Sequence, residues 1–254
     1  MSDTLKYMLD LAKKILAIPS PSGYCFDIIN YLDDEASKMG FATERSVKGN
    51  LIITVPCTSS EKILGLSAHV DTLGAMVKSI TGDGYLHFTT IGGPIWPTLD
   101  GEYVAVKTRS GKAYTGTFLS TSPSCHVYKD ASSKARTPDD MMIRIDEVVK
   151  SKDDVLKLGI APGDFVFIDP KTEITDSGFI KSRFLDDKIS VAILFGLLKD
   201  ISSGQVKPKM NLKLIISTYE EVGHGASSVP KVDELIAVDM GCVGDDLSCT
   251  EEMV

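Results

Sequence analysis

The chain has 254 residues, of which 43% are hydrophobic and 24% charged, and its formal net charge is −8. This composition predicts a soluble globular protein with one large domain or two modest ones. The negative charge argues against nucleic acid or an anionic membrane as a partner, and no apolar run approaches the length of a membrane span.

The N-terminal part predicts two helices followed by two strands. Apolar residues recur at helical spacing over residues 5–16 and stop before Pro19, which indicates an amphipathic helix rather than a signal peptide. A second helix is expected over about 24–39. Two strands follow, over residues 51–55 (LIITV) and 62–68 (KILGLSA).

Cysteine usage favours a reducing compartment. The five cysteines are odd in number and form no C-x-x-C pair: Cys25, Cys57, Cys125, Cys242 and Cys249. Reduced thiols are therefore expected rather than a disulfide framework, and a cytoplasmic location follows.

Residues 73–173 are richer in strand signals than the rest of the chain. Short β-type runs alternate with D-G and S-G turns, and one brief helix is expected between a Ser151 N-cap and Gly159. After residue 173, "SRFLDDKISVAILFGLLKDI" predicts a helix, and "NLKLIISTY" and "DELIAVDMG" predict buried strands. The expected fold is α/β: a mixed sheet flanked by helices over residues 1–72 and 174–254, interrupted by a small β-barrel-like module.

Three predicted strands end in possible metal ligands. They are His69 and Asp71 after "KILGLSA", Glu220 and Glu221 after "NLKLIISTY", and Asp239 after "ELIAV". Ligands in open α/β sheets gather beyond the carboxyl ends of the strands, so these side chains should meet at one edge. Asp186 and Asp187 begin a helix, whose positive end tolerates carboxylates.

One imidazole among several carboxylates suits zinc, cobalt or manganese. A shared carboxylate would let two such ions sit close together, activate a water and stabilise the oxyanion formed by attack on a carbonyl. Glu220 and Glu221 would then divide the work, one holding metal and the other moving a proton. Asp71 is placed to orient the imidazole of His69.

Each of these motifs also has an ordinary structural explanation. An isolated H-x-D is common, paired glutamates often mark a solvated loop, and two aspartates at a helix start often reflect a charge preference. The joint pattern favours the metal site. Other chemistries lack support, because the sequence has no H-E-x-x-H, no G-x-S-x-G and no Walker loop.

The strings "IPSPSGYCFDI", "LSAHVDTLGAMVKSI", "IKSRFLDDKISVAIL", "STYEEVGHGA" and "IAVDMG" resemble the M42 family of metallo-aminopeptidases, which includes bacterial glutamyl aminopeptidases. The resemblance runs over nearly the whole chain, including "KLGIAPGDFVFID". It implies a zinc-peptidase α/β domain, an inserted β-rich, PDZ-like dimerisation domain over 73–173, and homo-oligomers in which dimers form a dodecamer.

The resemblance also implies roles for individual residues. His69 and Asp239 would bind one metal, Asp186 would bridge two, Glu221 would bind the second, Glu220 would be the general base, and Asp71 would support His69. A cis peptide bond between Asp186 and Asp187 is implied as well.

One departure from the family concerns the second metal. Family members run further and contribute one more histidine near their C-terminus, whereas this sequence has no histidine beyond His224. The expectation is a chain that lacks the C-terminal part of the family. His224 is a possible substitute ligand, although Gly223 and Gly225 favour a turn that leads away from the site.

The sequence therefore predicts a metal-dependent aminopeptidase that acts on short peptides with a free N-terminus. The family's name suggests Glu or Asp as the residue removed. Two alternatives stay open: a metal-dependent deacylase of N-acyl amino acids, and an inactive or assembly-only subunit that lacks one metal ligand.

Overall fold

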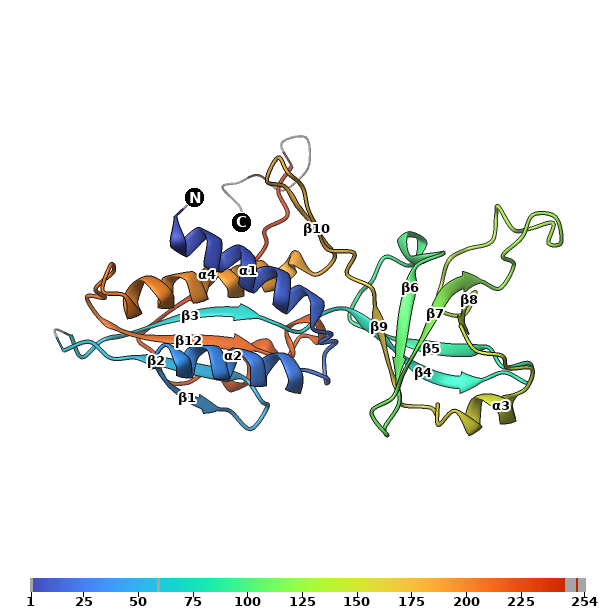
Figure 1. The fold of residues 1–254 in the computed structure, drawn as a ribbon, viewed down its shortest axis with the longest axis horizontal. Helices are drawn as coiled ribbons and strands as arrows, with labels where there is room; N and C mark the ends of the chain where they lie inside the picture. Colours follow the sequence, from blue (N-terminus) through green and yellow to red (C-terminus); the bar gives the residue numbers. More distant parts are fainter. Residues whose placement is uncertain (1, 59, 245–249, 251–254) are drawn as a thin grey trace.

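Two hydrophobic cores organise the computed structural model, one against a mixed sheet and one inside a barrel (Figure 1). The structure describes residues 2–58, 60–244 and 250. The order of strands and helices confirms the predicted fold class, a mixed α/β sheet interrupted by a β-barrel.

The five-stranded sheet has the order β1-β2-β12-β3-β13. Its strands are β1 (Ala42–Arg45), β2 (Leu51–Val55), β3 (Ile63–His69), β12 (Asn211–Ser217) and β13 (Glu234–Ala237). β12 and β13 run parallel to β3, whereas β2 runs antiparallel to β12. The carboxyl ends of β3 and β12 therefore point the same way, toward the barrel (Figure 1).

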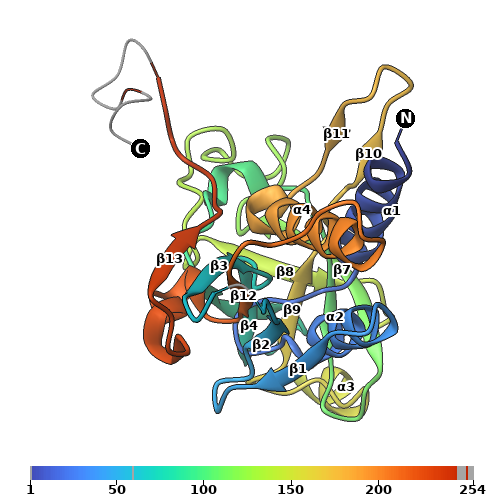
Figure 2. The ribbon, with the colours of Figure 1, turned by 90° about the vertical axis from the view of Figure 1, so that its left-hand side faces the viewer.

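Three helices lie on one side of this sheet (Figure 2). They are α1 (Asp3–Ala17), α2 (Phe26–Lys38) and α4 (Leu185–Ser202). The apolar stripe predicted for α1 is buried through Leu11, Ala12, Ile15 and Leu16, and Ser2 caps the helix by accepting a hydrogen bond from the Leu5 amide. Burial of these stripes against β2, β3 and β12 forms the first core.

The barrel closes in the order β4-β5-β8-β7-β6-β9. Its strands are β4 (Gly74–Ile80), β5 (Leu86–Ile91), β6 (Tyr103–Lys107), β7 (Ala113–Ser120), β8 (Met141–Ile145) and β9 (Phe165–Ile168). The brief helix α3 (Lys152–Lys157) begins after Ser151, which accepts a hydrogen bond from the Asp154 amide, as predicted. Trp96, in the 3₁₀ helix η1 (Trp96–Leu99), packs in the barrel core against Phe88 and Phe118.

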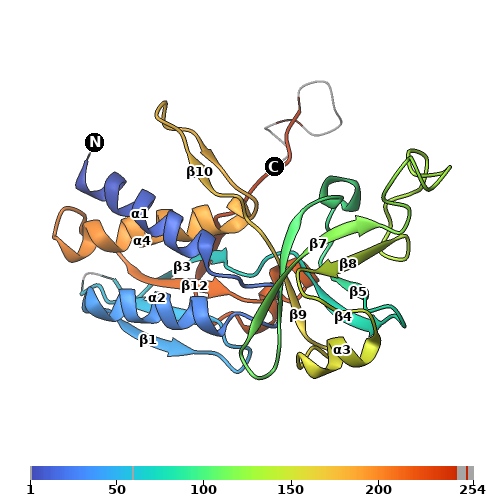
Figure 3. The ribbon, with the colours of Figure 1, turned by 45° about the vertical axis from the view of Figure 1, so that its right-hand side comes forward.

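A two-stranded hairpin connects the barrel to α4. It consists of β10 (Glu173–Ile174) and β11 (Ile180–Lys181), and it rises above the helices in Figure 3. After β12 the chain forms two short 3₁₀ helices, η2 (Glu220–Val222) and η3 (Gly225–Ser228).

The prediction of a buried strand over "DELIAVDMG" was wrong in one respect. β13 forms there, but all four of its residues are exposed. It is an edge strand that pairs with β3 alone, and the described residues place no helix over it (Figure 2). An apolar composition therefore predicted the strand correctly but not its burial.

The prediction of one regular helix through "FLDDK" also needs correction. Asp186 (φ −72°, ψ 110°) and Asp187 (φ −118°, ψ 23°) are not helical, and the peptide bond between them is cis. The regular part of α4 begins only after these two residues. Asp186 therefore projects from a kinked segment rather than from a helical first turn.

No helix in the described ranges is both long and apolar enough to cross a membrane. Cys25, Cys125 and Cys242 are free thiols, whereas the Cys57 thiol donates a hydrogen bond to the carbonyl oxygen of Pro208. Cys249 lies outside the described residues.

Candidate metal centre

The carboxyl ends of three parallel strands bring the predicted ligands to one edge. The register pairs His69 on β3 with Ser217 on β12, so the segment that carries Glu220 begins beside His69. Asp239 follows β13, the other neighbour of β3. The kinked start of α4 brings Asp186 to the same place, and the next residue, Asp187, accepts a hydrogen bond from the His69 amide on β3.

His69 lies at the centre of this group. Its Nε2 atom is 3.0 Å from Asp186 Oδ1, 3.6 Å from Glu220 Oε2 and 4.0 Å from Asp239 Oδ1. The His69 side chain is buried, whereas the three carboxylates are partly exposed to solvent. The site is therefore an imidazole at the bottom of an open ring of acids.

The other ring nitrogen of His69 is fixed by the main chain. His69 Nδ1 lies 3.0 Å from the carbonyl oxygen of Asp71, which can only accept a hydrogen bond. The neutral imidazole therefore carries its proton on Nδ1 and directs the lone pair of Nε2 toward the carboxylates. This is the orientation that a metal-binding histidine needs.

Asp71 is completely buried, and its carboxylate has several partners. Its oxygens accept hydrogen bonds from the amide of Glu220 at 3.0 Å, the amide of Glu221 at 3.1 Å and the hydroxyl of Ser22 at 2.6 Å. The same carboxylate lies 3.5 Å from His69 Nδ1. It therefore positions the main chain of both glutamates, in addition to the contact with His69 that the sequence led us to expect.

Asp187 is buried and binds the main chain of His69. Its Oδ2 accepts a hydrogen bond from the His69 amide at 3.0 Å, while Oδ1 is buried without a hydrogen-bond partner among the described residues. Burial raises the pKa of Asp187 to about 7, and the charge of Asp239 adds to the effect.

The crowded carboxylates disfavour one another's charge. Burial, followed by the charges of Asp186, Asp71 and Glu220, raises the pKa of Glu221 to about 7. Burial and the neighbouring carboxylates raise the pKa of Glu220 in the same direction. Burial lowers the pKa of His69, but Asp71, Asp187 and Glu220 together raise it to about 10. A cation at this position would relieve the repulsion and replace the proton.

The residues present fit a divalent metal ion. His69, Asp186 and Asp239 each offer one ligand atom, and these atoms all lie within 4.8 Å of one another. One nitrogen and two carboxylate oxygens are donors that zinc, cobalt and manganese accept. Among the described residues, neither Glu220 nor Glu221 belongs to this group.

The remaining predicted residues lie outside this three-residue group. Glu221 is held by Asp71 through its amide, beside the ring of acids. His224 is exposed in the turn after η2, where its amide donates to the Tyr219 carbonyl. The other two histidines, which the sequence did not assign to the site, lie in the barrel module: His87 on β5 and His126 exposed in a loop.

Sequence reasoning missed the contact between Ser22 and Asp71. The motif "SPSG" contains Ser22, but no local signal shows that its hydroxyl reaches a carboxylate 49 residues away. The structure brings them together because residues 20–22 run beside residues 70–72, joined by a bridge between Pro21 and Thr72.

A cavity of about 360 Å³ opens beside the metal ligands. It is lined by His69, Glu220 and Asp239 together with small or aliphatic residues such as Ala226, Val229 and Leu235. Acidic and apolar groups in one cavity suit a ligand with an ammonium group beside an apolar side chain.

Comparison with known proteins supports a peptidase assignment. The profile of the M42 glutamyl aminopeptidase family matches residues 49–254. A putative aminopeptidase, YhfE of Bacillus subtilis, is 44% identical over 99% of this chain, which spans 73% of that protein. The lysyl aminopeptidase of Pyrococcus furiosus is 26% identical over 84% of this chain, which spans 60% of that enzyme.

Among solved structures, the TET1 peptidase of Pyrococcus horikoshii superposes with a TM-score of 0.77 at 27% identity. The superposition covers 91% of this chain and 68% of that one, and TET1 is described as assembling into a tetrahedron or a large octahedral shell.

Proposed function

Because this chain belongs to the M42 family of aminopeptidases, we propose that it hydrolyses the first peptide bond of short peptides with a free N-terminus. The single observation that carries this proposal is the ring of His69, Asp186, Glu220 and Asp239 at one edge of the sheet. The chain spans only part of its relatives' length, so the proposal concerns the site that these residues form.

The proposal assigns His69, Asp186 and Asp239 to one divalent cation, and Asp186 with Glu221 to a second. Such a cation supplies Lewis-acid stabilisation for the charge that develops on the carbonyl oxygen, and it makes a nearby water more acidic. Zinc and cobalt both suit these donors.

Glu220 is the proposed general base. Its carboxylate belongs to the ring of acids and lies 3.6 Å from His69 Nε2. Its raised pKa brings it closer to the range in which it can both accept and return a proton. Glu220 would take a proton from the attacking water and deliver it to the leaving amine. Asp71 would keep the Glu220 main chain in place through the hydrogen bond from its amide.

The acidic ring also explains the choice of a free amine. An ammonium group beside Asp239 and the other carboxylates is attracted electrostatically, whereas an acetylated nitrogen is not. The relatives include a glutamyl and a lysyl aminopeptidase, so a substrate panel with both side chains identifies the residue that is removed. Association of copies into an oligomer through the barrel is part of the proposal, and the mass of the protein in solution tests it.

The first test is hydrolysis of amino-acid p-nitroanilides by metal-stripped protein to which zinc or cobalt is returned. We expect metal-dependent release from a free-amine substrate, and a loss of kcat of about a hundredfold or more in Glu220→Gln. Metal content should stay unchanged in this variant, because Glu220 is not among the ligands proposed here. Glu147→Gln, at an exposed position in the barrel module, is the matched control.

Two results would contradict the proposal. Turnover of an N-acetylated substrate in preference to the free amine would indicate a deacylase. Stoichiometric analysis that finds no bound metal, together with no turnover of any substrate by folded protein, would indicate an inactive or assembly-only chain.

A further inference from the structure

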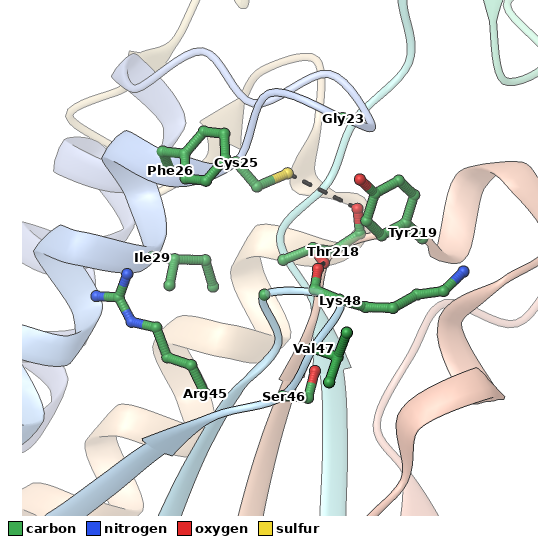
Figure 4. A pocket seen from close by; sticks show the side chains of 11 residues that line it. Gly23, Cys25, Phe26, Ile29, Arg45, Ser46, Val47, Lys48, Thr218 and Tyr219 are labelled. Atoms are coloured by element: carbon green, nitrogen blue, oxygen red, sulfur yellow. Dashed lines mark hydrogen bonds between the residues drawn. The ribbon is translucent and has the colours of Figure 1, made fainter.

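A second cavity lies at the same edge of the sheet, beside the segment after β12 that carries Glu220 (Figure 4). Its volume is about 160 Å³, and it opens between the start of α2, the turn before β2 and the end of β12. The residues that matter here are Phe26, Ile29, Val47, Lys48, Thr218 and Tyr219. Thr218 and Tyr219 immediately precede Glu220, so this cavity and the metal centre share one turn of the chain.

The strand order sets the separation between the two sites. His69 on β3 pairs with Ser217 on β12, and the neighbouring Ile216 pairs with Leu51 at the start of β2. Neighbouring strands lie about 4.8 Å apart, so the turn before β2 lies roughly 10 Å from His69 along the edge. Both sites face the same end of the sheet.

The charge at this cavity is opposite to that at the metal centre. None of the described residues lining it is acidic, although the chain as a whole carries a net charge of −8. Arg45 is paired with Asp33 at 2.7 Å, and Figure 4 shows its guanidinium directed away from Lys48. The Lys48 ammonium lies over the Tyr219 ring at 5.2 Å, and it has no ion pair within the described residues. It is therefore available to an anion.

The lining of the cavity is largely apolar, although Ser46 and Thr218 also belong to it. Ile29 is one of the apolar residues, and Phe26 and Val47 add exposed apolar surface, with exposed fractions of 69% and 105%. A dry cavity of about 150 Å³ lined by aliphatic and aromatic groups can hold a benzene molecule. The volume here therefore suits one aromatic or branched side chain.

We infer that this cavity holds the C-terminal residue of a short peptide substrate, whose apolar side chain enters it while Lys48 pairs with the free carboxylate. The inference rests on the proposed function, which places the amine end at the metal centre. An extended chain spans 3.3–3.6 Å per residue, so a tripeptide covers the roughly 10 Å between the two sites. The acidic ring and Lys48 then match the two opposite charges of a tripeptide.

The expected consequence is a preference for tripeptides with a free carboxylate and an apolar last residue. Leu-Gly-Phe should have a kcat/KM about fivefold higher than Leu-Gly-Phe amide, as is typical of a partly exposed ion pair. Leu-Gly-Phe should also be hydrolysed more efficiently than Leu-Gly-Gly, because burial of an aromatic side chain is favourable.

The test compares acid and amide within each protein, so that differences in folding or metal content cancel. In Lys48→Met the ratio of kcat/KM for Leu-Gly-Phe to that for its amide should fall to about one. Lys38→Met is the matched control, since Lys38 is an exposed lysine at the other end of α2 and should keep the wild-type ratio. Equal hydrolysis of acid and amide by the wild-type protein would overturn the inference.

A binding measurement separates failure of this inference from failure of the proposed function. If neither peptides nor p-nitroanilides are hydrolysed, the proposed function fails, and titration calorimetry with Leu-Gly-Phe and its amide tests the cavity directly. Tighter binding of the acid that is lost in Lys48→Met supports the cavity as a carboxylate site. Indistinguishable affinities, or no binding of either peptide, contradict it.

Discussion

Asp71 illustrates how a buried residue organises a site in which Asp186, Glu220 and Asp239 are exposed. Its carboxylate receives hydrogen bonds from the amides of Glu220 and Glu221 and from the Ser22 hydroxyl. Three donors can stabilise a charge that burial alone would make very costly. The positions of both glutamates thus depend on a residue that need not touch a substrate.

Removing the Ser22 hydroxyl tests this arrangement at the scale of one residue. We expect Ser22→Ala to lower the free energy of unfolding by about 1.5–3 kcal/mol, the range for a hydrogen bond to a charged group. It should also lower kcat more than it raises KM, because Glu220 would be held less firmly. Urea unfolding and steady-state kinetics measure the two effects.

Ser22→Thr keeps a hydroxyl at this position and should recover part of both losses. Ser133→Ala removes an exposed hydroxyl far from Asp71 and serves as the control. If Ser22→Ala matches this control in stability and in kcat, the hydrogen bond to Asp71 has no positioning role.

At the scale of the element, strand direction matters most in the sheet, and close packing of strands matters most in the barrel. The sheet brings ligands together because β3, β12 and β13 are parallel and end at one edge. The barrel instead depends on close approach of its strands. Gly116 on β7 shows this, because a Cβ atom there would lie 2.6 Å from the carbonyl oxygen of Arg144 on β8.

A methyl group at Gly116 should therefore separate β7 from β8. We expect Gly116→Ala to lower the free energy of unfolding of the barrel by about 1–3 kcal/mol, which is the usual cost of overpacking. Gly82→Ala is the control, since a Cβ there meets nothing within 4 Å. Equal stability of the two variants in urea unfolding would show that the strands can move apart without cost.

On the scale of the whole molecule, the barrel is joined to the metal centre by direct contacts. Tyr24, between α1 and α2, packs against Phe165 and Phe167 of β9, with ring centroids 5.3 and 5.0 Å away. Gly92, just after β5, approaches the segment of Glu221 so closely that a Cβ atom would lie 3.3 Å from the Glu221 carbonyl oxygen. The inserted module therefore forms part of the wall of the site.

This contact predicts that a barrel residue affects the chemistry at the sheet. Gly92 has φ +70°, and a Cβ there would also lie 2.5 Å from Leu73 Cδ2. We expect Gly92→Ala to lower kcat/KM by about tenfold or more, since small displacements of catalytic groups are costly. Titration of metal-stripped protein with zinc should show weaker binding as well.

Gly101→Ala provides the matched control for backbone strain. Gly101 also has a positive φ, +86°, but a Cβ there meets nothing within 4 Å. Both variants should lose about 1–2 kcal/mol of stability to the left-handed conformation. If both also lose the same fraction of activity, the effect is general strain and not pressure on Glu221.

Much of the fold, and the approach of several candidate ligands to one edge, could be predicted from the sequence, because their signals are local. The apolar stripe of α1, the cap at Ser151 and the turns of the barrel are read from neighbouring residues. His69 and Asp239 could be grouped because parallel strands have their carboxyl ends at one edge of the sheet. Polar residues at or just after those ends therefore lie near one another. The M42 resemblance added the order of the motifs, and the match of the family profile to residues 49–254 confirmed the family.

The tertiary structure alone decided what depends on contacts between distant segments. The Ser22 hydroxyl meets Asp71 across 49 residues, and Gly92 of the barrel reaches Glu221 across more than a hundred. The exposure of β13 also follows from its place at the edge of the sheet. Spacing and polarity along a chain determine which residues form a helix or a strand, and where a strand ends. Which side chains then touch depends on how separate elements pack, and no local pattern records that.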